Sequence, residues 1–152
     1  MIILGIDPGT TRIGYGVVKK TGNEYKFIDA GLINTKNKNQ SDRLIEINKE
    51  IVSLVNKFNP EKAGVEKLFF SKNKKTALTV SEARGVIIYS LTKKSIPIIN
   101  ISPNKAKISV TGNGNASKDA VAKMVGYILN IKTDKYIDDT TDALAIAIAA
   151  SD

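Results

Sequence analysis

The chain has 152 residues, of which 42% are hydrophobic and 25% are charged, and its formal net charge at pH 7 is +8. These values predict one domain, over residues 1–152, that buries its own core; they exclude wholesale disorder and favour a polyanionic partner, nucleic acid before membrane. Because cysteine and histidine are both absent from the sequence, disulfides, thiolate zinc sites and nucleophile–histidine pairs are excluded.

The first predicted element is a buried strand that ends on a carboxylate. Ile2 to Ile6 are apolar apart from Gly5, which is typical of a central strand covered on both faces. Asp7 ends the run, and Pro8-Gly9 predicts a turn. Further strands are predicted over residues 13–18 and 25–33, joined by a short hairpin turn. The three strands form an antiparallel meander.

Helices and parallel strands follow. A helix with an apolar stripe that includes Ile47, Ile51 and Leu54 is predicted from an N-cap at Ser41 to about Phe58, where Asn59-Pro60 ends it. Residues 62–66 predict a strand that again ends on a carboxylate, and residues 76–93 predict a second long helix with one apolar stripe.

The remaining elements complete a mixed sheet. Residues 96–101 predict a strand with Pro97 near its start, and residues 102–116 are assigned no regular element. Two helices are predicted, one capped by Ser117 and ending near residue 130, and one running from about residue 138 to the end of the sequence. The order implies an α/β fold with a five-stranded mixed sheet, three strands antiparallel and two parallel, with helices on both faces.

Four acidic residues are predicted to meet at one edge of this sheet. Asp7 and Glu66 both end strands, and ligands of such sheets gather beyond the carboxyl ends of parallel strands. Asp139 and Asp142 share one face of the last helix, and Asp138 can join them. Clustered carboxylates raise one another's pKa unless a cation holds them. Oxygen ligands favour Mg²⁺ or Mn²⁺, and two such ions can promote phosphodiester hydrolysis.

Each acidic residue alone also has an ordinary structural interpretation. Asp7 before Pro-Gly is more often a turn residue, and Glu66 at a strand end is neutral evidence. Asp139 and its acidic neighbours could simply cap the last helix and offset its dipole. The four together, after two buried strands and on one helix face, favour a functional site.

Motifs spread over the whole sequence match one family in order. They are Gly5-Ile-Asp-Pro-Gly-Thr-Thr-Arg-Ile-Gly-Tyr-Gly16, Glu66-Lys-Leu-Phe-Phe-Ser-Lys-Asn73, Ala83-Arg-Gly-Val86, Ile101-Ser-Pro-Asn-Lys-Ala-Lys107, Thr111-Gly-Asn-Gly114, Lys118 and Asp139-Thr-Thr-Asp-Ala-Leu-Ala-Ile-Ala147. This pattern resembles the RuvC family, the bacterial Holliday junction resolvases of the ribonuclease H-like superfamily. The resemblance implies a ribonuclease H-like fold and catalytic, metal-binding carboxylates at Asp7, Glu66, Asp139 and Asp142. Asp138 is an extra acid beside the motif.

The resemblance also implies residues that hold DNA. Phe69 takes the place of an aromatic side chain that stacks on an unpaired base, although either Phe69 or Phe70 can instead belong to the core. Lys107 and Lys118 resemble catalytic basic residues near the scissile phosphate, whereas an arbitrary lysine is more often only solvated. Weaker candidates for phosphate contacts are Arg12, Lys72, Lys74, Lys75, Arg84, Lys105 and the loop glycines Gly112 and Gly114.

The function that the resemblance implies is resolution of Holliday junctions in recombination and repair. The enzyme is expected to nick two opposed strands, using Mg²⁺ (with Mn²⁺ as a substitute) and two ions per site. It is expected to act as a homodimer with the RuvA–RuvB branch-migration complex, and Gly85 in the second long helix favours close helix packing. No signal peptide is recognisable, and the apolar run 143–150 is shorter than the roughly 20 residues that span a bilayer, so a cytoplasmic location is expected.

Three other functions remain open at this stage. Residues 5–11 also resemble the phosphate loop of the actin and hexokinase superfamily, which would make the chain an ATP-binding, sugar kinase-like protein. That fold needs two such domains. The chain could also be a non-catalytic DNA-binding or ribosome-associated relative, or a ribonuclease H proper. ATP binding, cleavage of a synthetic junction and cleavage of an RNA–DNA hybrid distinguish these alternatives.

Overall fold

The computed structural model describes residues 1–68, 74–134, 136 and 138–151, with the backbone alone at residues 74–76. Within these residues the strands are β1 (Ile2–Asp7), β2 (Arg12–Thr21), β3 (Glu24–Asn34), β4 (Lys62–Glu66) and β5 (Ile98–Ile101). The helices are α1 (Gln40–Phe58), α2 (Lys74–Lys93), α3 (Pro103–Thr111), α4 (Lys118–Leu129) and α5 (Asp138–Ala149).

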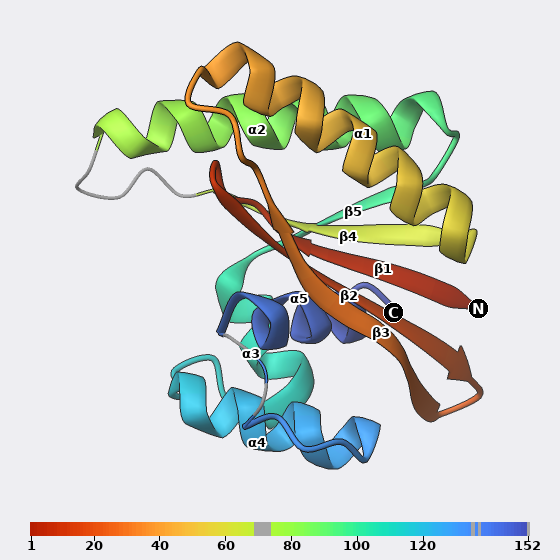
Figure 1. The fold of residues 1–152 in the computed structure, drawn as a ribbon. Helices are drawn as coiled ribbons and strands as arrows, with labels where there is room; N and C mark the ends of the chain where they lie inside the picture. Colours follow the sequence, from red (N-terminus) through yellow and green to blue (C-terminus); the bar gives the residue numbers. More distant parts are fainter. Residues whose placement is uncertain (69–73, 135, 137, 152) are drawn as a thin grey trace.

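The strands form a single mixed sheet in the order β3-β2-β1-β4-β5. β1 pairs antiparallel with β2, and β2 with β3, whereas β4 is parallel to both β1 and β5. Helices α1 and α2 cover one face, and α3, α4 and α5 cover the other (Figure 1). The predicted α/β class, with three antiparallel and two parallel strands and helices on both faces, is confirmed.

The core under α1 and α2 comes from the predicted apolar stripes. Ile47, Ile51 and Leu54 of α1 are buried against Leu4 and Ile6 of β1. Ala83, Ile87 and Leu91 of α2 belong to the same cluster. Burying a side chain of leucine or isoleucine size stabilises a fold by about 1.5–3 kcal/mol, so these stripes hold the two helices on the sheet.

Helix α5 lies unusually close to the other face of the sheet because glycines form the surface beneath it. A Cβ atom on Gly5 would overlap the main-chain oxygen of Ala143, and one on Gly64 would lie 2.7 Å from the Cβ atom of Ala150. A Cβ atom on Gly14 would overlap the main-chain oxygen of Asp139. Small α5 residues such as Ala147 lie against Gly5, so the main chains of the helix and the sheet approach each other closely there.

Helix α3 was not predicted, although its termini carry clear signals. Ser102 is the N-cap and accepts a hydrogen bond from the backbone N–H of Lys105, and Pro103 opens the helix. Gly112 ends it with φ at 73°, a left-handed conformation that favours glycine. The polar and basic side chains in this segment obscured these signals, because its apolar face is only two residues wide, Ala106 and Val110.

Other boundaries differ by one to three residues. Asn39, not Ser41, caps α1, and its side chain accepts from the backbone N–H of Ser41. β5 begins at Ile98, directly after Pro97, as an edge strand. Strands β2 and β3 are longer than predicted, and their ladder extends to the pair of Thr21 and Glu24 at the hairpin turn. No helix within the described residues is both long and apolar enough for a membrane span.

The expectation that Gly85 allows close helix packing is wrong within one chain. A Cβ atom at Gly85 would have no neighbour within 4 Å among the described residues. Gly85 therefore faces outward from α2 rather than toward α1.

Candidate active site and metal centre

A cavity of about 330 Å³ gathers the four predicted carboxylates. It is lined by Asp7, Glu66, Pro103, Ala106, Lys107, Lys118, Val121, Asp139, Asp142, Ala145 and Ile146. The acidic residues come from the ends of β1 and β4 and from the first turns of α5. Residues distant in the sequence thus share one cavity between the sheet edge and helices α3, α4 and α5.

Strand register explains why these side chains meet. Ile6 pairs with Val65 in the parallel ladder, so Asp7 and Glu66 follow side by side at the ends of their strands. Asp7 is also the partner of Gly14 in the antiparallel ladder. Because Gly14 is the residue on which the main chain of Asp139 packs, the start of α5 is held next to Asp7.

Asp7 and Glu66 behave as one coupled pair. Burial, the negative charges of Glu66, Asp142 and Asp139, and a hydrogen bond with Glu66 raise the pKa of Asp7 from 3.8 to about 8. Burial also raises the pKa of Glu66, against the hydrogen bond from Asp7. At neutral pH and without a bound cation, one proton therefore remains on the pair, and we place it on Asp7, which donates to Glu66.

The two acidic residues of α5 have cationic partners. The Nε of Arg12 donates to Oδ2 of Asp139. Nζ of Lys118 lies 3.6 Å from a carboxylate oxygen of Asp142 and also 3.6 Å from one of Asp138. Asp142 and Asp138 in turn raise the pKa of Lys118, and burial raises that of Asp142.

Asp138 differs from the other acids in its surroundings. Its side chain is 70% exposed, and it is not among the residues that line the cavity. Its contact in the structure is with Lys118. Asp138 therefore acts on the cavity through Lys118 and not as a member of its wall.

The donor set fits a divalent cation, although the side chains are not arranged around one. The four acids supply only oxygen atoms, which suits Mg²⁺ or Mn²⁺, and the burial and neighbouring negative charges that raise the pKa of Asp7 favour a positive partner. In the described part of the chain, no three acidic side chains already have the spacing of a metal site. Cation binding would require Asp139 and Asp142 to turn from Arg12 and Lys118.

The predicted basic residues divide into two groups. Lys107 and Lys118 line the cavity, whereas Lys105 is exposed on α3 and is not part of the lining. Arg84 donates from Nε to the main-chain oxygen of Glu66 at 2.8 Å and from its terminal nitrogen to Asn100. Arg84 thus holds the end of β4, which carries Glu66, in place.

The structure describes the two loop glycines but not the aromatic candidate Phe69. Gly112 ends α3, and a Cβ atom on Gly114 would lie 2.6 Å from the side chain of Asn104, so both glycines have structural reasons to be present. Phe69 and Lys72 lie outside the described residues, together with Phe70. Lys74 and Lys75 open α2, and their side chains also lie outside the described part.

Sequence reasoning did not foresee the role of Arg12 beside Asp139. These residues are 127 positions apart, and Arg12 was only a weak candidate for phosphate binding. The available signal was its position at the start of β2, immediately after the turn that follows Asp7.

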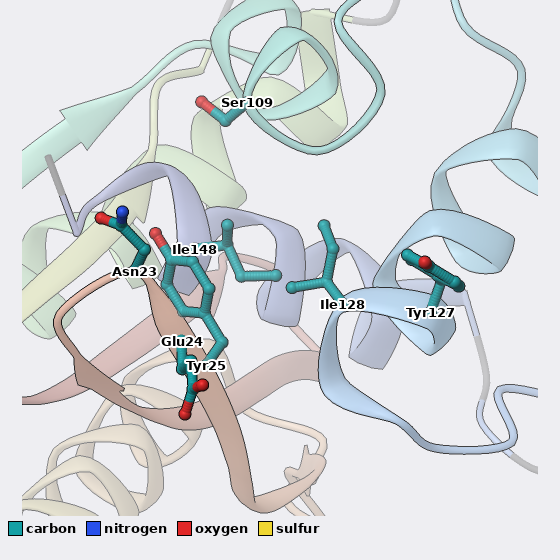
Figure 2. A pocket seen from close by; sticks show the side chains of 7 residues that line it. All are labelled: Asn23, Glu24, Tyr25, Ser109, Tyr127, Ile128 and Ile148. Carbon is teal, nitrogen blue, oxygen red and sulfur yellow. The ribbon is translucent and has the colours of Figure 1, made fainter.

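A second cavity, of about 570 Å³, lies at the opposite end of the sheet, near the β2–β3 turn (Figure 2). Figure 2 shows Tyr25 of β3 and Ile148 of α5 on one side and Tyr127 of α4 on the other. Glu24 is the one carboxylate among the described residues of its lining. This cavity is larger than the first, but its side chains lack the clustered acids and lysines that phosphoryl chemistry requires.

Comparison with known proteins gives a consistent result. Residues 3–150 match the family model described as "Crossover junction endodeoxyribonuclease RuvC". A protein of that name from Brachyspira hyodysenteriae is 48% identical over 152 residues, covering 98% of this chain and 92% of the relative. Another, from Halothermothrix orenii, is 46% identical over 149 residues, covering 97% and 90%.

Solved structures agree with the sequence matches. The structure of Thermus thermophilus RuvC in complex with a Holliday junction substrate has a TM-score of 0.92 and 30% identity, and the match covers 98% of this chain and 92% of that one. A fowlpox virus resolvase, also solved with Holliday junction DNA, has a TM-score of 0.63 at 19% identity, which supports the fold alone.

Proposed function

The chain belongs to the RuvC family of crossover junction endodeoxyribonucleases, and we propose that Asp7, Glu66, Asp139 and Asp142 form the divalent-metal centre with which it cuts Holliday junctions. The observation that carries the proposal is the convergence of these four carboxylates, with two lysines, on one cavity. Such an enzyme acts in homologous recombination and DNA repair.

Mg²⁺ is the proposed metal, with Mn²⁺ as a substitute and two ions per site. When bound, divalent cations supply Lewis acidity to the phosphate and make water a better nucleophile. The oxygen-only ligand set supports these ions over zinc. The protein's part is to hold four carboxylates in place and to release the proton shared by Asp7 and Glu66, so that all four become anionic ligands.

Lys107 and Lys118 are proposed to act on the scissile phosphate. Both line the carboxylate cavity, so their ammonium groups add positive charge where an oxyanion develops. Lys118 is paired with Asp142 and Asp138, and it becomes available to a phosphate when Asp142 turns toward a metal. The expected products are a 5′-phosphate and a 3′-hydroxyl, which a ligase can seal.

Other basic residues are proposed to hold the DNA backbone. The formal net charge of +8 supports a strong, salt-dependent attraction to DNA. Lys105 is exposed close to Lys107 in the sequence, and Lys72, Lys74, Lys75 and Arg84 remain candidates by resemblance, as do the loop glycines Gly112 and Gly114. Phe69 remains the proposed aromatic residue for stacking on an unpaired base.

A homodimer is proposed because two symmetric nicks need two active sites. The outward surface of α2 supports this assembly: Leu78 and Tyr89 are 64% and 59% exposed, and Gly85 lies between them on the same side of the helix. We call Leu78, Gly85 and Tyr89 the outer α2 face. The RuvA–RuvB complex is the proposed partner in branch migration, on the strength of the family alone.

The direct test is cleavage of a synthetic mobile junction, compared with linear duplex and with an RNA–DNA hybrid, with and without Mg²⁺. Paired symmetric nicks are expected in the junction only, and only with the metal. Asp7→Asn should bind the junction without cutting it. Cleavage by Asp7→Asn at the wild-type rate would contradict the proposed metal centre.

A further inference from the structure

The ion pair between Arg12 and Asp139 lies between two concave regions of the surface. On one side is the carboxylate cavity, which Asp139 lines. On the other is a shallow depression lined by Gly9, Thr10, Thr11, Arg12, Asn34, Thr35, Val80 and Asp139. Among the described lining residues, Asp139 belongs to both sets and Arg12 to that of the depression.

The depression has the chemistry of a site for a sugar–phosphate backbone. Its lining consists mostly of small residues and of hydroxyl and amide side chains, from Gly9 to Thr11 and at Asn34 and Thr35. Among the described residues of this lining Arg12 is the cation, and its side chain is 49% exposed. A guanidinium group beside hydroxyl and amide donors suits a phosphate, because each of these groups can donate to its oxygen atoms.

Anchoring of α5 does not explain the ion pair. The main chain of Asp139 is already pressed against Gly14, and Thr141 donates to the main-chain oxygen of Asp138 at 2.8 Å within the same turn. An ion pair as exposed as this one adds little stability. The contact therefore determines mainly where the carboxylate of Asp139 points.

We infer that Arg12 exchanges partners when substrate binds: it holds Asp139 in the free protein and moves to a DNA phosphate in the depression when Asp139 turns into the carboxylate cavity. The inference rests on the proposed function, because a cation in that cavity is what draws Asp139 away. A cation there also repels the guanidinium group, which favours the exchange. Arg12 is thus a DNA-binding residue for the strand that continues past the cleavage site.

The test uses Arg12→Gln and Arg12→Lys with an intact synthetic junction in Ca²⁺, with gels verifying that the junction is not cut. Arg12→Gln should weaken binding on the order of tenfold and lower the slope of log affinity against log salt by about one. Arg12→Lys should keep the wild-type slope. Lys26→Gln is the control. Lys26 is the ladder partner of Lys19 at the opposite end of the sheet, so the loss of its charge should leave the affinity for the junction and the salt slope unchanged.

A second measurement follows Mn²⁺ binding without DNA. Arg12→Gln should bind Mn²⁺ more tightly than the wild type, because Asp139 no longer has a competing cation. An unchanged salt slope or an unchanged Mn²⁺ affinity in Arg12→Gln would overturn the exchange. Failure of the proposed metal centre is recognised separately, because Asp7→Asn would then still cut the junction whatever Arg12 does. Thermal melting of each variant verifies that it is folded.

Discussion

The main chain of Asp139 packs directly on Gly14, with no space for a Cβ atom between them. Gly14 is in turn the ladder partner of Asp7. A single glycine therefore sets the separation between a carboxylate at the start of the sequence and the two that α5 carries. The site depends on this close approach of helix and sheet as much as on the acids themselves.

Gly14→Ala should destabilise the protein by about 2–4 kcal/mol, because the added methyl group overlaps the main chain of Asp139 and α5 must shift. Cleavage should fall more than junction binding, since Asp139 and Asp142 move with the helix. Urea titration and cleavage rates measure the two effects. Gly85→Ala is the matched control: its methyl group meets nothing within 4 Å, and it should gain up to about 1 kcal/mol of helix propensity.

Asp7→Asn should stabilise the metal-free protein at pH 8. The folded state keeps the proton of Asp7 up to about pH 8, whereas the unfolded chain releases it near 3.8. The free energy of unfolding of the wild type therefore falls as pH rises from 4 to 8 and levels off above that. Asparagine stays neutral, so the variant should lack this fall and gain about 1–3 kcal/mol at pH 8.

Melting temperatures from pH 4 to 9 in a chelator measure this effect. Asp134→Asn, at an exposed residue outside the cavity, should follow the wild-type curve. Adding Mg²⁺ should stabilise the wild type more at pH 8 than at pH 6, because binding must displace the shared proton. Parallel pH curves for the wild type and Asp7→Asn would contradict the coupled pair.

Lys118→Gln should slow cleavage by about 10²-fold while junction binding changes little, because the lost charge acts on the phosphate in the transition state. Asp138→Asn is the comparison. It leaves Lys118 paired with Asp142, so the cleavage rate should stay within a few-fold of wild type. Single-turnover rates at saturating enzyme separate the two variants, and equal losses in both would assign Asp138 a direct part in the centre.

Tyr89→Ser combined with Leu78→Ser should convert a dimer into monomers, because both side chains belong to the outer α2 face. Light scattering during gel filtration gives the mass. Tyr127→Ser removes a more exposed aromatic residue, at 83% exposure, from α4 on the other side of the sheet, and should leave the mass unchanged. If the wild type is itself a monomer at micromolar concentration, the proposed assembly is wrong.

Local sequence patterns were sufficient for most of the fold. The apolar stripe that includes Ile47 and Ile51 predicted α1, and the uniformly apolar β1 predicted a central strand, since both patterns reflect burial directly. Helix α3 was missed because it buries only Ala106 and Val110, which is too little to produce a periodic signal. Only its ends carry local signals, the N-cap Ser102 and the terminal Gly112.

The acids of the site could be predicted, but their cationic partners could not. Asp7 and Glu66 end adjacent parallel strands, and this topology follows from the order of the elements. The pairing of Asp139 with Arg12 depends on how α5 lies across β2, which depends on the close contact at Gly14. Contacts of this kind arise from three-dimensional packing and leave no periodic pattern.

Two of the four carboxylates, Asp7 and Glu66, lie in the first half of the sequence and the other two lie on α5, and this separation has a consequence for biosynthesis. A ribosome that stalls before residue 139 releases a product with Asp7 and Glu66 but without α5, whose residues fill the core on that face of the sheet. Such a fragment has half of the acids and an uncovered apolar surface. The four-carboxylate centre is therefore complete only once α5 has been synthesised, and products that lack α5 should be degraded by proteases rather than cut DNA.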